Sequence, residues 1–212
     1  MKLNALLAGV ALAAVATLGA ASANADVLYD NHTPASHTVN AWTLGFDFEV
    51  SDSFNLAQAS TLTGVSFDGW NFPGETATSV DWAILDASPE FSGSTLFSGT
   101  GALAAAATGD SGFGVYTIDT YSFALPSLHL DAGTYWLKLA DAQGASVTYW
   151  DESDGASQSF HNTNGEIGSH TFTVTGSTGA IPEPATWALM LTGFFGAGVV
   201  LRDQRRRAYA AA

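Results

Sequence analysis

The sequence predicts an all-β protein: an antiparallel β-sandwich of jelly-roll type, flanked by an N-terminal signal peptide and a C-terminal transmembrane helix. Short runs rich in Val, Ile, Thr, Phe, Tyr and Trp recur between residues 26 and 175, where helical periodicity is nearly absent. Gly, Asp, Asn, Ser and Pro separate these runs, as turn residues do. Apolar and polar residues alternate within the runs, which is typical of antiparallel sheets with one face in water. Eight or nine such strands indicate a sandwich.

The individual strands follow from this alternation. Residues 42–50 would place Phe46 on one face with its alternate neighbours, and residues 133–140 would place Trp136 and Lys138 on the face opposite the core. The predicted strands are 27–31, 42–50, 61–71, 80–86, 95–101, 115–123, 133–140, 147–151 and 170–175. The alanine-rich residues 102–108 fit an edge strand, a helical turn or a loop.

The first 25 residues have the three parts of a secretory signal peptide. Lys2 supplies the positive start, and an apolar run of Leu, Ala and Val follows it. Ala23 and Ala25 form an A-x-A site, so we expect cleavage before Asp26. A retained anchor helix is the alternative, but a polar and acidic segment follows at once, which favours cleavage.

An uncharged apolar segment near the C-terminus predicts a membrane span. Residues 185–201 contain 17 residues without a charge, at the short end of what crosses a bilayer core. A buried core helix is the alternative, but such a helix normally keeps a polar face. Arginines next to a span stay in the cytoplasm, so the preceding domain would lie outside the inner membrane. The arginines that follow the span are Arg202, Arg205, Arg206 and Arg207.

The residues around the start of the span form a motif. They read Pro182-Glu183-Pro184, with Trp187 and Ala188 following. The motif, the hydrophobic segment and the terminal basic cluster resemble, in this order, the PEP-CTERM sorting signal in its PEPxxWA form. The resemblance implies a Gram-negative host with an exosortase, a membrane-embedded cysteine protease-transpeptidase that processes such tails, and an association with exopolysaccharide and biofilm systems. The two prolines also disfavour helix, which leaves the segment extended as a protease substrate should be.

The chain therefore divides into four segments. They are a signal peptide at 1–25, a β-sandwich domain at 26–175, a flexible linker at 176–181, and a sorting signal at 182–207 that ends in a basic cluster at 202–207.

The charge of the exported domain is strongly negative. Of the 20 acidic residues in the chain, 18 lie between residues 26 and 181, where Lys138 is the only Lys or Arg. Such a surface repels phosphates, so nucleic acid is excluded as a partner. The charge favours solubility and would attract cations. The chain has no cysteine, so it has no disulfide and no zinc-thiolate site.

Motifs for catalysis are missing from the sequence. It has no G-x-S-x-G, no P-loop and no G-x-G-x-x-G after a strand, so we predict no catalytic residue and no nucleotide cofactor. The five histidines form no H-x-H or H-E-x-x-H pattern. The acidic residues 150–155 do not match an EF-hand loop; a solvated loop is the favoured interpretation and a calcium site the alternative.

Two tryptophans are candidates for a sugar-stacking platform, although core packing is the usual role of such rings. They are Trp136 and Trp150. We expect a non-enzymatic protein that signal peptidase and an exosortase process, first anchored in the inner membrane and then placed at the cell surface or in the extracellular matrix. A carbohydrate-binding module that holds a polysaccharide is the first alternative, and a secreted hydrolase is the second.

Overall fold

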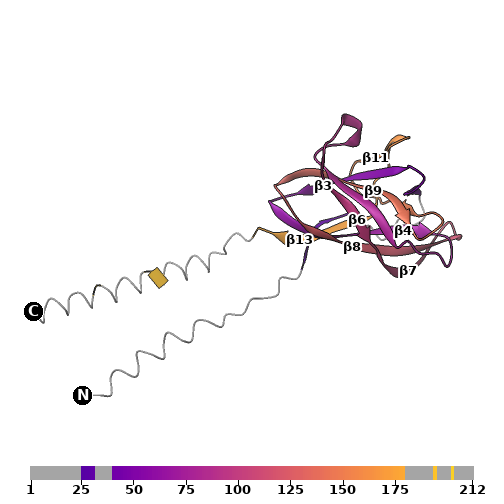
Figure 1. The fold of residues 1–212 in the computed structure, drawn as a ribbon, viewed down its shortest axis with the longest axis horizontal. Coiled ribbons are helices and arrows are strands. Elements are labelled where there is room, and N and C mark those ends of the chain that lie inside the picture. The colour runs from indigo at the N-terminus through magenta and orange to yellow at the C-terminus, as the bar shows by residue number, and fades with distance from the viewer. Residues whose placement is uncertain (1–24, 32–39, 180–192, 195–201, 203–212) are drawn as a thin grey trace, which may run out of the picture.

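The computed structural model describes residues 25–31, 40–179, 193–194 and 202, and it confirms an all-β sandwich (Figure 1). Thirteen strands and one 3₁₀ turn form the described part of the domain. In chain order they are β1 (Asp26–Asp30), β2 (Ala41–Thr43), β3 (Glu49–Leu56), β4 (Ser60–Asn71), β5 (Ser79–Leu85), the 3₁₀ turn (Pro89–Phe91), β6 (Thr95–Ala102), β7 (Ala104–Gly112), β8 (Tyr116–Leu130), β9 (Gly133–Gln143), β10 (Tyr149–Asp151), β11 (Ser159–His161), β12 (Gly165–Ile167) and β13 (Phe172–Thr178).

Sheet A has seven strands around the long strand β4. One edge of β4 pairs with β8, and β7 pairs with the far edge of β8. The other edge of β4 pairs first with β13 and then with β10, which in turn pair with β1 and β2. All of these pairs are antiparallel, as the alternation predicts.

Sheet B has six strands in the order β12-β11-β3-β9-β5-β6, again with antiparallel pairing. One hydrophobic cluster joins the inner faces of the two sheets and forms the core. Leu62, Val65 and Phe67 of β4 are buried in it, and so are Leu137 and Leu139 of β9. Burial of these inward side chains is the main stabilising contribution to the sandwich.

The prediction of one strand over residues 42–50 is wrong. The chain leaves β2 at Thr43, turns, and enters β3 at Glu49 in the opposite sheet. The Phe48 N–H donates to the Gly45 carbonyl at 3.1 Å, which closes the turn. Phe46 lies at the tip of the turn with φ of 58° and with 71% of its surface exposed, so it is not a core residue.

The alanine-rich segment is a strand at the edge of sheet A. Strand β7 pairs with β8 and carries the chain over from β6, the last strand of sheet B. Strand β8 continues to Leu130, seven residues beyond the predicted end at residue 123. Strand β13 continues through Thr178, so the first residues of the predicted linker at 176–181 are part of the domain.

Both ends of the domain lie at the same end of the sandwich. Asp26 at the start of β1 pairs with Gly176, and Thr178 pairs with Ser60 at the start of β4. The predicted signal peptide, span, sorting motif and basic cluster lie outside the described residues, apart from Ala25, residues 193–194 and Arg202. Within the described ranges, no helix has the length and apolar character needed to cross a bilayer.

Candidate functional site

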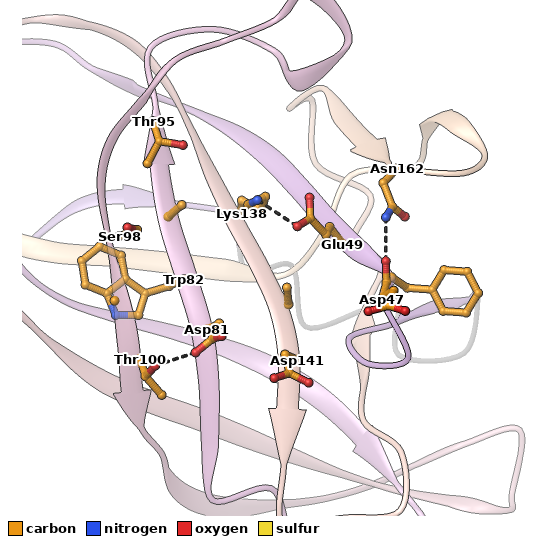
Figure 2. Close-up of a pocket in the computed structure, with 14 residues that line it drawn as sticks. Asp47, Glu49, Asp81, Trp82, Thr95, Ser98, Thr100, Lys138, Asp141 and Asn162 are labelled. Carbon is orange, nitrogen blue, oxygen red and sulfur yellow. Dashed lines mark hydrogen bonds and ion pairs between the residues drawn. The ribbon is translucent and has the colours of Figure 1, made fainter.

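A groove of about 860 Å³ lies on the outer face of sheet B (Figure 2). Strands β3, β9, β5 and β6 form its floor, and the segments that precede β3 and follow β11 form one side. The lining residues are Asp47, Phe48, Glu49, Asp81, Trp82, Ala83, Thr95, Ser98, Gly99, Thr100, Lys138, Ala140, Asp141 and Asn162.

Strand alternation explains why a lysine stands on this face. Leu137 and Leu139 point into the core, so Lys138 between them points outward. Its direct cross-strand neighbours are Ser51 on β3 and Ala83 on β5. These side chains are small, so they leave open space beside the lysine side chain at the floor of the groove. The next row has the same character, because Ala140 separates the larger Glu49 from Asp81.

Three polar contacts order the groove, and Figure 2 shows all of them. Lys138 Nζ donates to Glu49 Oε1 at 3.0 Å, and the pair remains partly exposed. Thr100 Oγ1 donates to Asp81 Oδ1 at 2.6 Å across the β5–β6 pair. Asn162 Nδ2 donates to the Asp47 carbonyl at 2.8 Å and so holds the segment after β11 against the turn before β3.

The groove is acidic. Four carboxylates line it, and Lys138 is the only Lys or Arg among residues 26–179. Carboxylate oxygens accept hydrogen bonds strongly, and the ammonium group donates them. The groove can therefore bind hydroxyl or amino groups, and it repels anionic ligands. The carboxylates are those of Asp47, Glu49, Asp81 and Asp141.

Backbone strain gathers at one end of the groove. Phe46, Asp47 and Asp141 all have positive φ, at 58°, 67° and 47°. Aspartate tolerates this region, but a bulky phenylalanine is an outlier there. A residue in such a strained backbone conformation lowers the stability of the fold by on the order of 1–3 kcal/mol, and such residues cluster at functional sites. The Ala142 N–H donates to the Leu44 carbonyl at 2.6 Å, which ties the end of β9 to the strained turn.

His161 supports the same end of the groove from below. Its ring lies 4.8 Å from the Trp42 ring and 5.3 Å from the Phe48 ring, measured between centroids. Burial lowers the pKa of His161, so the imidazole is neutral at pH 7. The next residue, Asn162, is held at the groove wall by its own backbone N–H, which donates to the Glu49 carbonyl at 3.1 Å.

The predicted sugar platform of Trp136 and Trp150 is wrong for Trp150. That ring is completely buried between the sheets, and its indole N–H donates to the Thr171 carbonyl at 2.7 Å. Trp136 does lie on the outer face of sheet B, at the edge of a smaller hollow of about 230 Å³. It is only 6% exposed, because it packs against Leu85 and Phe160. The two rings belong to different sheets and cannot form one surface.

The acidic residues 150–155 are mostly structural and do not form the predicted solvated loop. Asp151 is completely buried, and Ser153 is 9% exposed. Trp42 Nε1 donates to Glu152 Oε1 at 2.5 Å, and Asn31 Nδ2 donates to Ser153 Oγ at 3.1 Å. In the described ranges, no three His, Asp or Glu side chains are grouped so that they could hold a metal ion.

One Ser-His-Asp arrangement exists that the sequence did not reveal. Ser159 Oγ lies 3.0 Å from His170 Nδ1, and Asp52 Oδ2 lies 3.7 Å from the same nitrogen. A catalytic triad needs the serine and the aspartate on opposite ring nitrogens. His170 and Asp52 are also completely buried, so no substrate reaches them. This cluster is part of the polar core and is not a hydrolytic site.

The groove residues were predicted only in part. Alternation places Asp81 and Lys138 on the outer face of their strands, and this signal was available in the sequence. The register that brings Glu49 opposite Ala140 was not. No known family model matches the chain, and no curated protein matches it either.

Proposed function

We propose that this protein is an exported, non-catalytic surface or matrix protein that binds polysaccharide in the groove of sheet B. The observation that carries the proposal is the groove itself: an open trough of about 860 Å³ on an outer sheet face, lined by hydrogen-bonding side chains over a floor of small residues. A sugar chain offers hydroxyl groups on every residue, and the groove offers carboxylate acceptors and one ammonium donor.

Charge narrows the class of polysaccharide. Polyanionic chains would meet Asp47, Asp81 and Asp141 with only Lys138 to compensate, so we expect them to be repelled. Neutral chains and chains with free amino groups suit the groove. Lys138 is already paired with Glu49 at 3.0 Å, so its ammonium group is held in position over the floor.

The delivery part of the proposal rests on the terminal motifs. A signal peptide would export the chain, the PEP-CTERM-like tail would hold it in the inner membrane of a Gram-negative cell, and an exosortase would release it to the surface or the exopolysaccharide matrix. We also propose a jelly-roll type of sandwich. The path of the chain supports this topology, because the chain crosses repeatedly between sheets A and B. Examples are the connections from β2 to β3, from β3 to β4 and from β4 to β5.

A secreted hydrolase is less well supported. The Ser159, His170 and Asp52 side chains have the wrong geometry for a triad and lie in the core. Calcium in the acidic segment also has little support, because Asp151 and Ser153 are buried as part of the fold. Binding without catalysis therefore remains the better proposal.

Deleting residues 182–212 tests delivery. In cells that lack the exosortase, we expect the truncated protein to be released in soluble form and the full chain to remain with the membrane fraction, because the deletion removes the apolar segment and the arginines. Immunoblots of the two fractions measure this. Replacing only Pro182, Glu183 and Pro184 with alanine is the matched control: the precursor should stay in the membrane, unprocessed. Retention of the truncated chain in the membrane would refute the proposal.

Removing groove carboxylates tests the ligand site. We expect the double variant Asp81→Ala, Asp141→Ala to bind the exopolysaccharide of the producing cell at least tenfold more weakly than the native chain, as measured by co-sedimentation. Asp131→Ala, which removes an exposed carboxylate outside the groove, should bind normally. Equal binding by the double variant and the native chain, or no binding by the native chain, would show that the groove is not a polysaccharide site.

A further inference from the structure

We propose that the outer face of sheet A carries a second, aromatic surface that binds the ring faces of a neutral sugar chain. This surface would bind the same class of ligand as the groove, but it lies on the other sheet. The proposal for it does not depend on the proposal for the groove. We call it the aromatic patch. It consists of Trp70, Phe72, Phe113, Tyr116 and Tyr149.

The five rings form a continuous set. Tyr116 is central: its ring centroid lies 5.9 Å from Trp70, 5.1 Å from Phe72 and 5.5 Å from Tyr149. Phe113 meets Trp70 edge-on at 5.3 Å. Trp70 belongs to the end of β4 and Phe72 follows that strand directly, while Phe113 lies in the β7–β8 turn, Tyr116 at the start of β8 and Tyr149 at the start of β10. Three neighbouring strands therefore support the rings.

The patch lies on the outside of the sandwich. Trp70 is directly opposite Ile118 on β8 and Tyr149 on β10, and neither Trp70 nor Ile118 belongs to the core cluster. Trp70 is nevertheless only 2% exposed, because the end of β7 covers its ring. A Cβ on Gly112 would lie 2.6 Å from Trp70 Cδ2, so only glycine fits at this contact. Trp70 is the buried base of the patch.

The rings around this base are open to solvent. Phe72 is 38% exposed and Phe113 is 63% exposed, while Tyr116 and Tyr149 are partly exposed. Phe113 has φ of 49° in a turn that the Val115 N–H closes by donating to the Gly112 carbonyl at 3.0 Å. Gly114 follows with φ of 68°. A turn with two successive positive φ values is most stable with the pair Asn-Gly. Phenylalanine at the first of these positions is therefore less favourable for the turn than asparagine. An exposed ring at a strained backbone position is typical of a functional site.

The chemistry of the patch fits sugar rings. Aromatic faces pack against the C–H faces of pyranoses, and hydroxyl groups bond to the sugar hydroxyls. Tyr116 and Tyr149 supply phenol groups beside the exposed phenylalanines. Burial, and then the contact with Tyr116, raises the pKa of Tyr149, so its hydroxyl remains a donor at neutral pH.

Charge argues against the other occupants. A second copy of the chain would bring another 18 acidic residues with one lysine towards the first domain, which opposes self-association. An anionic membrane surface is repelled for the same reason. The patch also stands at the far end of β4 from Ser60, which pairs with Thr178 where the domain ends. Strand β4 spans roughly 35 Å over its length. Figure 1 shows β13 and β7 towards opposite ends of the domain.

Two binding surfaces on opposite sheets would let a matrix protein bridge polysaccharide chains. The groove faces outward from sheet B and the patch faces outward from sheet A, so one domain can hold two sugar chains at once. A protein with this arrangement cross-links polysaccharide, and its apparent affinity for a dense matrix exceeds that of either site alone.

Oligosaccharide titration of the full chain in detergent tests the patch. The probes are the hexasaccharides of a neutral β-glucan and a neutral mannan, with calorimetry as the readout. Phe72→Ala combined with Phe113→Asn should weaken binding of at least one probe at least tenfold, and the new Asn-Gly pair suits the turn, so the fold is kept. Phe91→Ala, which removes a 77% exposed ring from the 3₁₀ turn, should bind as the native chain does.

The outcomes separate the two sites. The groove variant Asp81→Ala, Asp141→Ala should still bind the probe at the patch, and the patch variant should still bind polysaccharide at the groove. Unchanged affinity for both probes when the two patch substitutions are added to the groove variant would overturn the proposal, because the groove can then no longer account for the binding. A sedimentation coefficient that falls in the patch variant, with sugar affinity unchanged, would identify a second copy as the occupant and would also overturn it.

Discussion

Replacing Trp150 with alanine is expected to lower the free energy of unfolding by about 3–5 kcal/mol, the largest loss that we predict for a single side chain. The ring is completely buried and lies 6.0 Å from the Phe67 ring, 5.7 Å from the Phe172 ring and 4.9 Å from the His170 ring. Alanine would leave a cavity among these rings, and the Thr171 carbonyl would lose its donor at 2.7 Å.

Urea unfolding followed by circular dichroism measures this loss. Trp150→Phe is the matched variant, because it keeps one aromatic ring in the core but removes the indole N–H and part of the ring volume; it should lose about 1–3 kcal/mol. Phe91→Ala controls for the loss of an aromatic ring at an exposed position and should change stability by less than about 0.5 kcal/mol. A Trp150→Ala chain as stable as the native one would mean that this ring is not in the core.

Replacing Gly176 with alanine is expected to lower the free energy of unfolding by about 1–3 kcal/mol, although the change adds only one methyl group. A Cβ at this position would overlap the backbone carbonyl oxygen of Thr61 and lie 2.8 Å from Leu28 Cδ1 and 3.0 Å from Leu62 Cα. Backbone atoms of β4 cannot move aside as a flexible side chain can. Strand β13 would have to separate from β4 where the pairing already shifts register between Thr175 and Gly176.

Gly179→Ala is the control for this prediction. Its Cβ would lie 3.6 Å from the Ala59 carbonyl oxygen, an ordinary contact, so stability should change little. Thermal unfolding of both variants beside the native chain gives the comparison. Equal midpoints for Gly176→Ala and Gly179→Ala would contradict the close approach of β13 to β4. This test also shows whether the domain continues past residue 175.

The two outer faces of the sandwich differ in chemistry. Sheet B presents carboxylates and a lysine around small floor residues, whereas sheet A presents aromatic rings at the end away from Asp26 and Thr178. Both faces have a phenylalanine at positive φ beside the proposed site, Phe46 near the groove and Phe113 in the patch. In each case the ring is more than half exposed, so core packing does not explain its position.

Local patterns predicted most of the strands correctly. The bounds of β4, β5, β6 and β9 lie within a few residues of the predicted ones. Each of these strands can be recognised from its own residues, because apolar and polar side chains alternate along it. The turn at Gly45–Phe48 was missed, since Phe-Asp is not a usual pair for two positive φ values. The length of β8 was missed too, since Pro126 interrupts its pattern.

The sequence alone determined the strand-forming alternation, the negative charge of residues 26–181 and the predicted motifs at both ends, because each of these depends only on residues close together in the chain. The tertiary structure decided which strands are neighbours. Only strand pairing places Ser51 and Ala83 beside Lys138 to open the groove, and only strand pairing brings Trp70 between Ile118 and Tyr149. These contacts join segments far apart in sequence, where register depends on how the whole core packs.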